Sequence, residues 1–331
     1  MIVITRTPVR ISFLGGGTDY AEFFTQHGGG EVLATAIDKY SYLKVNTLHD
    51  FFEYRVRVGY SRTELVQRVE EIQHPSVREC LRFTGAPLPL EINYTGDLPS
   101  RTGLGSSSSF TVGLLHALHA YKGEVVGAEQ LAREALEVEH EWIRERVGYQ
   151  DQCMAAYGGF RHIIFRSEKE IEVRPVPLSA KRMEELREYM LVFYTGLTRY
   201  ANEVLKEQIK KTSDGSNTAA LVKMREMVGK GVELLTSGGR LEEFGELLHA
   251  SWELKQSLSS AITTPAIVEG YERARKAGAV GGKLLGAGGG GFLLFIVPPA
   301  RQGNVREALA PMKELRFEFE PLGSQIIFYH P

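Results

Sequence analysis

The sequence is 331 residues long, 43% hydrophobic and 24% charged, with 39 basic and 41 acidic side chains. This composition is typical of a soluble globular protein with room for two domains, and the near-neutral charge argues against a broad nucleic-acid or membrane surface. Residues 1–6 lack the features of a secretory signal, and the longest apolar run, 292–297, is too short to span a bilayer. Two cysteines, Cys80 and Cys153, cannot form a disulfide framework or a zinc site alone. We therefore expect a cytoplasmic monomer or homodimer without nucleic-acid or membrane partners.

The first half of the chain alternates strand-like and helix-like stretches. Apolar and polar residues alternate as in strands at 9–14, 42–45 and 90–94. Helices are expected from about Ser106 to near Gly123 and over 128–146.

The second half is richer in helical patterns. The expected elements are a strand at 190–194, helices over 199–238, 241–259 and 265–277, and a strand at 292–297. The charged, proline-containing stretch 167–181 is interpreted as the connection between the halves. We therefore divide the chain into a first domain, 1–175, and a second domain, 176–331.

The 35 glycines are unusual because they are clustered beside apolar strands. The clusters are Gly15-Gly16-Gly17, Gly28-Gly29-Gly30, Gly103 with Gly105, and Gly286 with Gly288 to Gly291. Glycines at strand and helix ends let backbone amides approach an anion closely. Ordinary tight turns would account for one or two clusters only, so the pattern indicates a phosphate-rich ligand.

The segment 99–109, Pro-Ser-Arg-Thr-Gly-Leu-Gly-Ser-Ser-Ser-Ser, precedes an apolar helix. The first-turn amides of that helix and its dipole favour an anion, and a serine hydroxyl there can bind Mg²⁺. A plain helix cap is the alternative, although it needs one serine and not four. No Lys-Ser/Thr pair follows the glycines, so the loop is not a Walker A motif. The run 286–291 formally matches a dinucleotide fingerprint, but it precedes a strand, which is the wrong order.

Glu139 is a carboxylate in the middle of an apolar stripe of the expected helix 128–146. The other acidic residues of this helix, Glu134, Glu137, Glu141 and Glu145, fall on other faces, where we expect solvent. A carboxylate buried alone is costly, so Glu139 needs a cation. A basic side chain and a metal ion both remain open.

Asp151 and Arg10 also stand out by their positions. Asp151 lies just beyond the expected end of that helix, where a turn or cap role is the alternative. Arg10 lies in an apolar strand, where the alternative is a structural ion pair. Cys153 and the helical His116 and His119 are expected to pack rather than to catalyse.

Three motifs occur together in one order: residues 8–20, 99–109 and 281–291. Between them, Glu139-His140 lies twelve positions before Asp151. In these features the chain resembles the GHMP kinases, small-molecule kinases that include galactokinase and mevalonate kinase. The resemblance implies an α+β fold of two domains, a ribosomal S5 domain 2-like N-terminal domain and a ferredoxin-like C-terminal domain.

The resemblance also implies ATP and Mg²⁺ as cofactors. Ser107 and Glu139 would hold Mg²⁺ on the β- and γ-phosphates. Asp151 would orient or deprotonate the acceptor hydroxyl, and Arg10 would stabilise its anionic form and the transferring phosphoryl group. The residues expected to bind the nucleotide are Pro99, Arg101, Thr102, Gly103, Leu104, Gly105, Ser106, Ser107, Ser108 and Ser109.

For the acceptor, the resemblance implies a small-molecule sugar phosphate. The residues expected to bind it are Gly16, Gly17, Thr18, Asp19, Lys39, Arg199, Gly288 and Gly289. Galactokinases have a Glu-His pair where this chain has Gly16-Gly17, and the lost carboxylate would admit a bulky or anionic substituent at C6. The motifs look most like those of the D-glycero-α-D-manno-heptose 7-phosphate kinases, which phosphorylate the anomeric hydroxyl for GDP-heptose synthesis. Lys39, Arg101 and Arg199 are candidates for holding a distal phosphate, and ordinary surface charge is an equal alternative for each.

Three other functions stay open. L-Fucose kinases carry related motifs. Another GHMP activity, such as mevalonate or homoserine phosphorylation, is disfavoured by Thr18-Asp19-Tyr20, which favours a sugar. A sensor that binds sugar and ATP without turnover is disfavoured because Arg10, Ser107, Glu139 and Asp151 are all present.

Overall fold

The computed structural model describes the backbone of residues 1–100, 102–197 and 201–331, and their side chains except those of 201–205. The elements of the first half are β1 (Ile2–Leu14), α1 (Ala21–Phe24), β2 (Gly30–Thr47), β3 (Val56–Gly59), β4 (Thr63–Val66), α2 (Pro75–Thr84), β5 (Leu90–Gly96), α3 (Ser106–Tyr121), α4 (Ala128–Glu137), α5 (Gln150–Tyr157), β6 (Phe160–Phe165) and β7 (Ile171–Pro175). Those of the second half are α6 (Ala180–Tyr189), β8 (Met190–Tyr194), α7 (Ala201–Ser213), α8 (Thr218–Thr236), α9 (Leu241–Ser257), α10 (Pro265–Lys276), β9 (Gly281–Leu284), β10 (Phe292–Ile296), α11 (Gln302–Leu309), β11 (Lys313–Glu314) and β12 (Gln325–His330). A π-helical turn, Val138–Trp142, follows α4 directly. None of the described helices is both long and apolar enough to cross a membrane.

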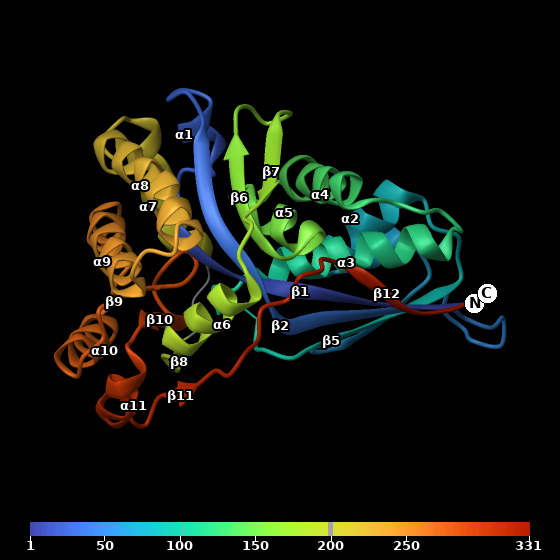
Figure 1. The fold of residues 1–331 in the computed structure, drawn as a ribbon. Coiled ribbons are helices and arrows are strands. Elements are labelled where there is room, and N and C mark those ends of the chain that lie inside the picture. The colour runs from blue at the N-terminus through green and yellow to red at the C-terminus, as the bar shows by residue number, and fades with distance from the viewer. Residues whose placement is uncertain (101, 198–200) are drawn as a thin grey trace.

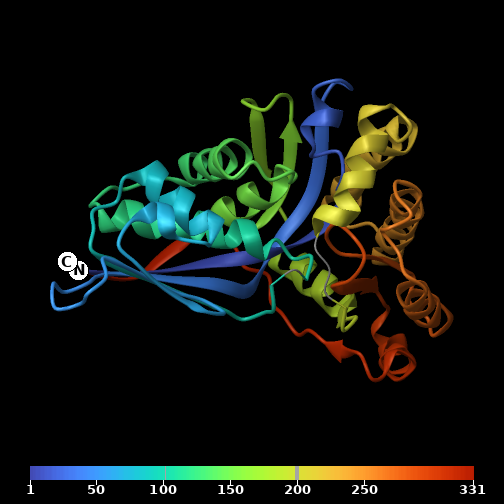
Figure 2. The ribbon, with the colours of Figure 1, turned by 180° about the vertical axis from the view of Figure 1, so that it is seen from behind.

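The larger sheet is built around the long β1–β2 pair. Its strands run in the order β12-β1-β2-β5-β3-β4, and β6 and β7 extend it beside the other half of β2 (Figure 2). Arg10 of β1 lies opposite Ala36 of β2 in the antiparallel register. The last strand returns to the first, with Ile2 opposite His330, so the two chain ends lie side by side (Figure 1).

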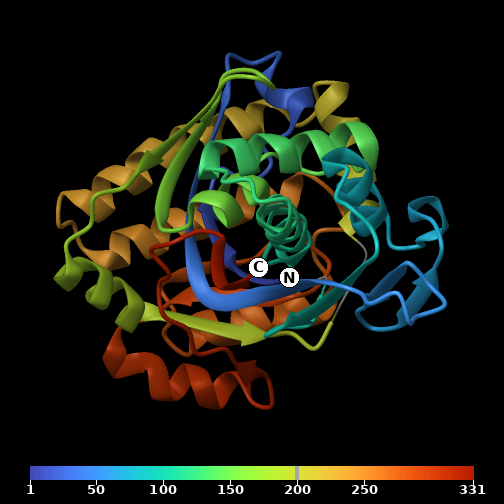
Figure 3. The same cartoon turned by 90° about the vertical axis from the view of Figure 1, so that its right-hand side faces the viewer.

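Helix α3 lies across this sheet and is seen nearly end-on in the centre of Figure 3. It packs closely on β1 because Gly113 has no side chain, and a Cβ there would lie 2.6 Å from the Thr7 hydroxyl. The Thr5 hydroxyl donates to the Gly113 carbonyl at 2.9 Å, and the Ser109 hydroxyl donates to the Thr7 carbonyl at 2.9 Å. These bonds fix the beginning of α3 beside the middle of β1, next to Arg10.

The smaller sheet has the order β11-β8-β10-β9, and all its pairs are antiparallel. Helices α9 and α10 pack on it through aromatic side chains. The Tyr271 ring lies 6.1 Å from Trp252 and 5.5 Å from Phe295.

A hydrophobic cluster joins the two halves of the chain. Phe13 near the end of β1 stacks on Phe160 at 5.4 Å and meets Phe244 of α9 edge-on at 5.6 Å. Ile11 of β1 belongs to the same buried cluster as Val192 of β8. Because β1 takes part in this cluster and carries Arg10, the packing of the second half helps to place that residue.

The expected strands and the helix beginning at Ser106 are confirmed. The continuous helix 128–146 is wrong beyond Glu137, because the Ile143 amide donates to the Val138 carbonyl, five residues back, and the π turn ends the helix. The helix 199–238 is interrupted at residues 214–217, where Gly215 has a φ of +83°. The stretch 167–181 contains β7, which pairs with β6. The division at 175 and 176 stays a prediction.

Candidate active site

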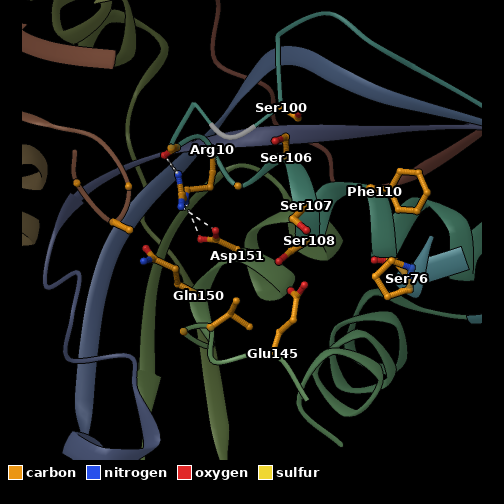
Figure 4. Close-up of a pocket in the computed structure, with 18 of the residues that line it drawn as sticks. Arg10, Ser76, Ser100, Ser106, Ser107, Ser108, Phe110, Glu145, Gln150 and Asp151 are labelled. Atoms are coloured by element: carbon orange, nitrogen blue, oxygen red, sulfur yellow. Dashed lines mark hydrogen bonds and ion pairs between the residues drawn. The ribbon is translucent and has the colours of Figure 1, made fainter. Parts of the chain in front are cut away.

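A cleft of about 640 Å³ runs between the beginning of α3 and the glycine loops (Figure 4). It brings together residues from all three sequence motifs. Those that line it include Arg10, Gly17, Asp19, Gly103, Gly105, Ser106, Ser107, Ser108, Asp151, Gly286, Gly288 and Gly290. Three segments that are far apart in the sequence therefore meet at one cleft.

Arg10 and Asp151 form a two-point ion pair in this cleft (Figure 4). Arg10 Nε donates to Asp151 Oδ1 and Nη2 donates to Oδ2, both at 2.7 Å. The remaining Nη1 donates to the Gly103 carbonyl at 2.6 Å. The Arg10 side chain is 6% exposed and that of Asp151 is 24% exposed, so the carboxylate keeps a face toward the cleft. Asp151 belongs to the first turn of α5, not to a loop.

The serine-rich beginning of α3 faces the same space. Gly105 precedes the helix with a φ of +77°, and a Cβ at this position would lie 3.1 Å from Asp151 Oδ2. Ser106, Ser107 and Ser108 follow one another along the cleft wall (Figure 4). Since the first-turn amides of a helix lack intrahelical acceptors, this end is suited to phosphate.

Glu139 is buried behind α3, as the apolar stripe predicts, and is 1% exposed. Its Oε2 accepts from the Ser108 hydroxyl at 3.0 Å and from Gln152 Nε2 at 2.5 Å. Its Oε1 has no hydrogen-bond partner among the described residues. Burial raises the pKa of Glu139 to about 7. An unpartnered buried carboxylate oxygen fits a hard cation.

Glu139 alone cannot supply all the ligands of a Mg²⁺ ion, so other groups would have to complete its coordination. Within the part of the chain that the structure describes, no three His, Cys, Asp or Glu side chains cluster as a metal site. Mg²⁺ is commonly held by one or two carboxylates together with substrate phosphates, so this donor set is compatible with the ion. Ser108 donates to Glu139, and both Ser108 and Ser107, the serine expected to share the ion with Glu139, line the cleft.

The other end of the cleft is formed around Asp19. Its Oδ1 accepts from the Gly17 amide at 2.9 Å, and Oδ2 has no partner among the described residues. Burial raises the pKa of Asp19 above its ordinary value. Thr18 is not part of the cleft lining, and its hydroxyl lies within hydrogen-bonding distance of the carbonyls of Gly15 and Glu31, both at 2.8 Å.

The two glycine loops of the site are in contact. A Cβ at Gly286 would lie 2.4 Å from the Cα of Gly103, and one at Gly103 would lie 2.4 Å from the Leu285 carbonyl. The third motif, residues 281–291, therefore supports the serine-rich segment 99–109 and also lines the cleft. Gly289 lies outside the lining, and its amide donates to the Ile262 carbonyl at 2.9 Å.

Several expected ligands lie elsewhere. Lys39 is not brought to the cleft: its Nζ pairs with Asp38 at 2.6 Å beside a separate groove. Four members of the loop 99–109 hold its shape instead: Pro99, Thr102, Leu104 and Ser109. Arg101 and Arg199 lie outside the described residues.

Sequence reasoning missed two parts of the site. One is an aromatic wall at the end far from Arg10, where the His74 and Phe110 rings stack at 4.9 Å and Tyr94 meets Phe110 edge-on at 5.1 Å. The other is a pair of polar residues near Asp19, Gln150 and Lys255. The rings come from a helix cap, a strand and α3, so no sequence motif unites them.

Among the polar residues predicted to stay in solvent, Glu134 is instead buried. It bonds His119 Nε2 at 2.6 Å, and this contact ties α4 to α3. Cys153 is free and buried, as expected of a packing residue, and Cys80 is free and buried as well.

Comparison with known proteins agrees with this geometry. A D-glycero-alpha-D-manno-heptose 7-phosphate kinase of Campylobacter jejuni is 28% identical over 323 residues, 92% of each chain. A galactokinase of Thermotoga maritima is 27% identical, covering 98% of this chain and 96% of its own. The solved structure of a D-glycero-D-manno-heptose 1-phosphate kinase from Bacteroides thetaiotaomicron has the same fold, with a TM-score of 0.79, 22% identity and complete coverage of both chains.

Two family models match more than half of the chain between them. The GHMP kinases N terminal domain matches residues 62–159, and the GHMP kinases C terminal domain matches 232–313. Kinases of this family use ATP. The chain belongs to the GHMP kinases and is a phosphotransferase.

Proposed function

We propose that this enzyme transfers the γ-phosphate of ATP to the anomeric hydroxyl of D-glycero-α-D-manno-heptose 7-phosphate, which gives the 1,7-bisphosphate used for GDP-heptose. The observation that carries the kinase chemistry is the Arg10–Asp151 pair, which lies between the anion-binding end of α3 and Asp19. The sugar assignment is supported by the relative that is 28% identical over 92% of the chain.

The nucleotide would lie along α3. Its phosphates would meet the amides at Ser106 to Ser108, and its base would reach the aromatic wall at His74 and Phe110. Stacking of a flat base on aromatic rings suits this end, whereas the polar, charged end suits a sugar. ATP would therefore occupy the end of the cleft with His74 and Phe110, and the sugar would occupy the end with Asp19.

Asp151 would orient the acceptor hydroxyl and take up its proton. Both carboxylate oxygens already accept from Arg10, but each keeps a further lone pair for a hydroxyl. Phosphoryl transfer passes through a loose transition state, so positioning and charge neutralisation matter most. Arg10 supplies positive charge directly beside the transferring group.

Mg²⁺ would be held by Glu139 and a serine hydroxyl of α3, Ser107 or Ser108. When bound, the ion would neutralise charge on the phosphates of the nucleotide. Glu139 is prepared for this role because one of its oxygens is buried without a partner among the described residues.

The test is a comparison of acceptors. We expect kcat/KM for heptose 7-phosphate to exceed that for mannose and L-fucose by roughly tenfold to a hundredfold, since a gripped phosphate adds charge-assisted hydrogen bonds. Phosphorus NMR of the product should place the new phosphate on the anomeric oxygen. The heptose assignment fails if L-fucose is preferred by more than about tenfold or if another carbon is phosphorylated.

A further inference from the structure

Lys255 is a buried lysine that the kinase reaction as described does not use. It belongs to the last turn of α9, is 6% exposed and lines the cleft. Its Nζ donates one long hydrogen bond, 3.4 Å, to the Gly16 carbonyl. Among the described residues, no carboxylate lies within 4.0 Å of it. An ammonium group has three N–H donors, so two of those of Lys255 have no acceptor among the described residues.

Burial of such a group without an anion is unfavourable. Burial lowers the pKa of Lys255, and the nearby Asp19 charge opposes that effect without removing it. A ligand that brings a negative charge to Nζ would supply the missing partner. The unfavourable free energy of burying the Lys255 ammonium therefore indicates that a ligand places an anionic group beside it.

A second observation concerns the surroundings of Gly16. Gly16 is itself buried, and the side on which a side chain would stand faces three polar groups from three different elements. A Cβ at Gly16 would lie 3.7 Å from Ser12 Oγ, 3.9 Å from Gln150 Nε2 and 3.9 Å from Lys255 Nζ, with no heavy atom closer. Ser12 is 3% exposed and its hydroxyl has no hydrogen-bond partner among the described residues. A hydroxyl, an amide and an ammonium thus converge as donors beside a position without a side chain.

The hydrogen-bond donors around this point favour an anion. Arg10 and Asp151 are paired with each other. Asp19 is the negative charge near Lys255; its Oδ1 accepts from the Gly17 amide, and its Oδ2 has no partner among the described residues. None of the three converging groups is itself acidic. Three donors of this kind resemble the ligands of a phosphate oxygen more than those of a neutral hydroxyl.

We propose that Lys255, together with Ser12 and Gln150, binds the distal phosphate of the sugar acceptor. This inference rests on the proposed function and names the residues that select a phosphorylated sugar. It replaces Lys39, which the structure places outside the cleft. Gly16 is part of this site, because a side chain longer than that of alanine would reach the three donors.

The first experiment measures selectivity. We compare kcat/KM for D-glycero-D-manno-heptose 7-phosphate with kcat/KM for the same heptose without its phosphate, in wild type, Lys255→Met and Lys39→Met. Lys255→Met should lower the ratio of the two values by at least about tenfold, because charge-assisted bonds to the phosphate are lost. Lys39→Met, the same change at an ion-paired surface lysine, should leave the ratio unaltered.

A second pair of variants tests the same site without removing the lysine. Gly16→Glu would place a carboxylate beside Nζ and repel the sugar phosphate, so the ratio should fall at least about tenfold here too. Gly16→Ala is the matched control for added bulk, because its nearest contact, 3.7 Å, is an ordinary one. It should lower the ratio much less than Gly16→Glu. Circular dichroism and MgATP titration show whether each variant is folded.

The outcomes separate this inference from the proposed function. If wild type does not prefer the phosphorylated heptose, the proposed function is wrong. If wild type prefers it and Lys255→Met keeps that preference, only the inference is overturned. If Lys255→Met lowers both kcat/KM values equally, or weakens MgATP binding, Lys255 acts on the nucleotide or on Asp19 and the inference is also overturned.

Discussion

Arg10 and Asp151 are separated by 141 residues and yet are joined by two hydrogen bonds of 2.7 Å. The rigid fork of a guanidinium matches a carboxylate in this arrangement, which fixes direction as well as distance. The same guanidinium also donates to the Gly103 carbonyl. Arg10 of β1 is therefore bonded both to α5 and to the segment 99–109. The carboxylate is therefore placed relative to the loop that would carry the nucleotide.

Asp151→Asn should lower kcat at least about a hundredfold, because an amide can neither take up the hydroxyl proton nor accept both guanidinium bonds. MgATP affinity should stay nearly unchanged, since the nucleotide would bind along α3. A coupled ADP-release assay and calorimetric titration measure the two quantities. A near-wild-type kcat would remove Asp151 from the mechanism.

The parts of the site carried by local pattern could be predicted from the sequence. Glycines and serines before an apolar run predict the phosphate-binding end of α3, and the apolar stripe predicts the burial of Glu139. For Arg10, a structural ion pair and a catalytic role were alternatives. The structure shows that the ion pair exists and that its partner is the expected catalytic residue, so the alternatives do not exclude each other.

The parts that depend on contacts between distant elements could not be predicted. Lys255 lies in an ordinary-looking turn of α9, and only its approach to Gly16 distinguishes it from a surface lysine. Glu134 was expected in solvent because its helix face is polar, but His119 of α3 covers it. The π turn at Val138–Trp142 changes the helix period locally, so a fixed period cannot describe the residues beyond it.

Glu139→Gln should weaken Mg²⁺-dependent nucleotide binding, because a neutral amide is a poorer ligand for a hard cation. Glutamine retains the shape and can still accept from Ser108, so the fold should persist. Titration of ATP with and without Mg²⁺ isolates the effect, which should appear only with the metal. Equal MgATP affinity in variant and wild type would make Glu139 a structural residue.

His119→Gln should destabilise the protein more at pH 6 than at pH 8.5. His119 bonds Glu134 and Glu124, both at 2.6 Å, and the hydrogen bond to Glu134 is the main cause that raises the pKa of His119 in the folded state. A raised histidine pKa stabilises the fold fully below the unfolded value of about 6.5, and that contribution is lost as pH rises through the folded value. The loss of unfolding free energy should therefore be larger at pH 6 by on the order of 1 kcal/mol, the scale of a charged hydrogen bond. Urea unfolding of both proteins at the two pH values measures it, and a pH-independent difference would show that the imidazole stays neutral.

Gly286→Ala should reduce both stability and activity, because the third glycine motif holds the serine loop. Gly286 has a φ of +79°, and an added Cβ would lie 2.4 Å from the Cα of Gly103, which is backbone that cannot rotate away. We expect a loss of roughly 1–3 kcal/mol in unfolding free energy from the backbone conformation and the contact.

The activity should fall further than the stability loss alone requires, because displacement of Gly103 also moves the carbonyl that accepts from Arg10. Gly303→Ala is the matched control: it lies in α11, and the added carbon has no heavy atom within 4 Å apart from its chain neighbours and the backbone of its own helix. Its kcat/KM should stay close to wild type and its unfolding free energy should not fall, since alanine is the better helix former. Urea unfolding and kcat/KM under conditions in which both variants are folded give the comparison. If Gly286→Ala is destabilised but keeps the kcat/KM of Gly303→Ala, the contact between the two glycine loops serves the fold and does not position Arg10 and Asp151 for catalysis.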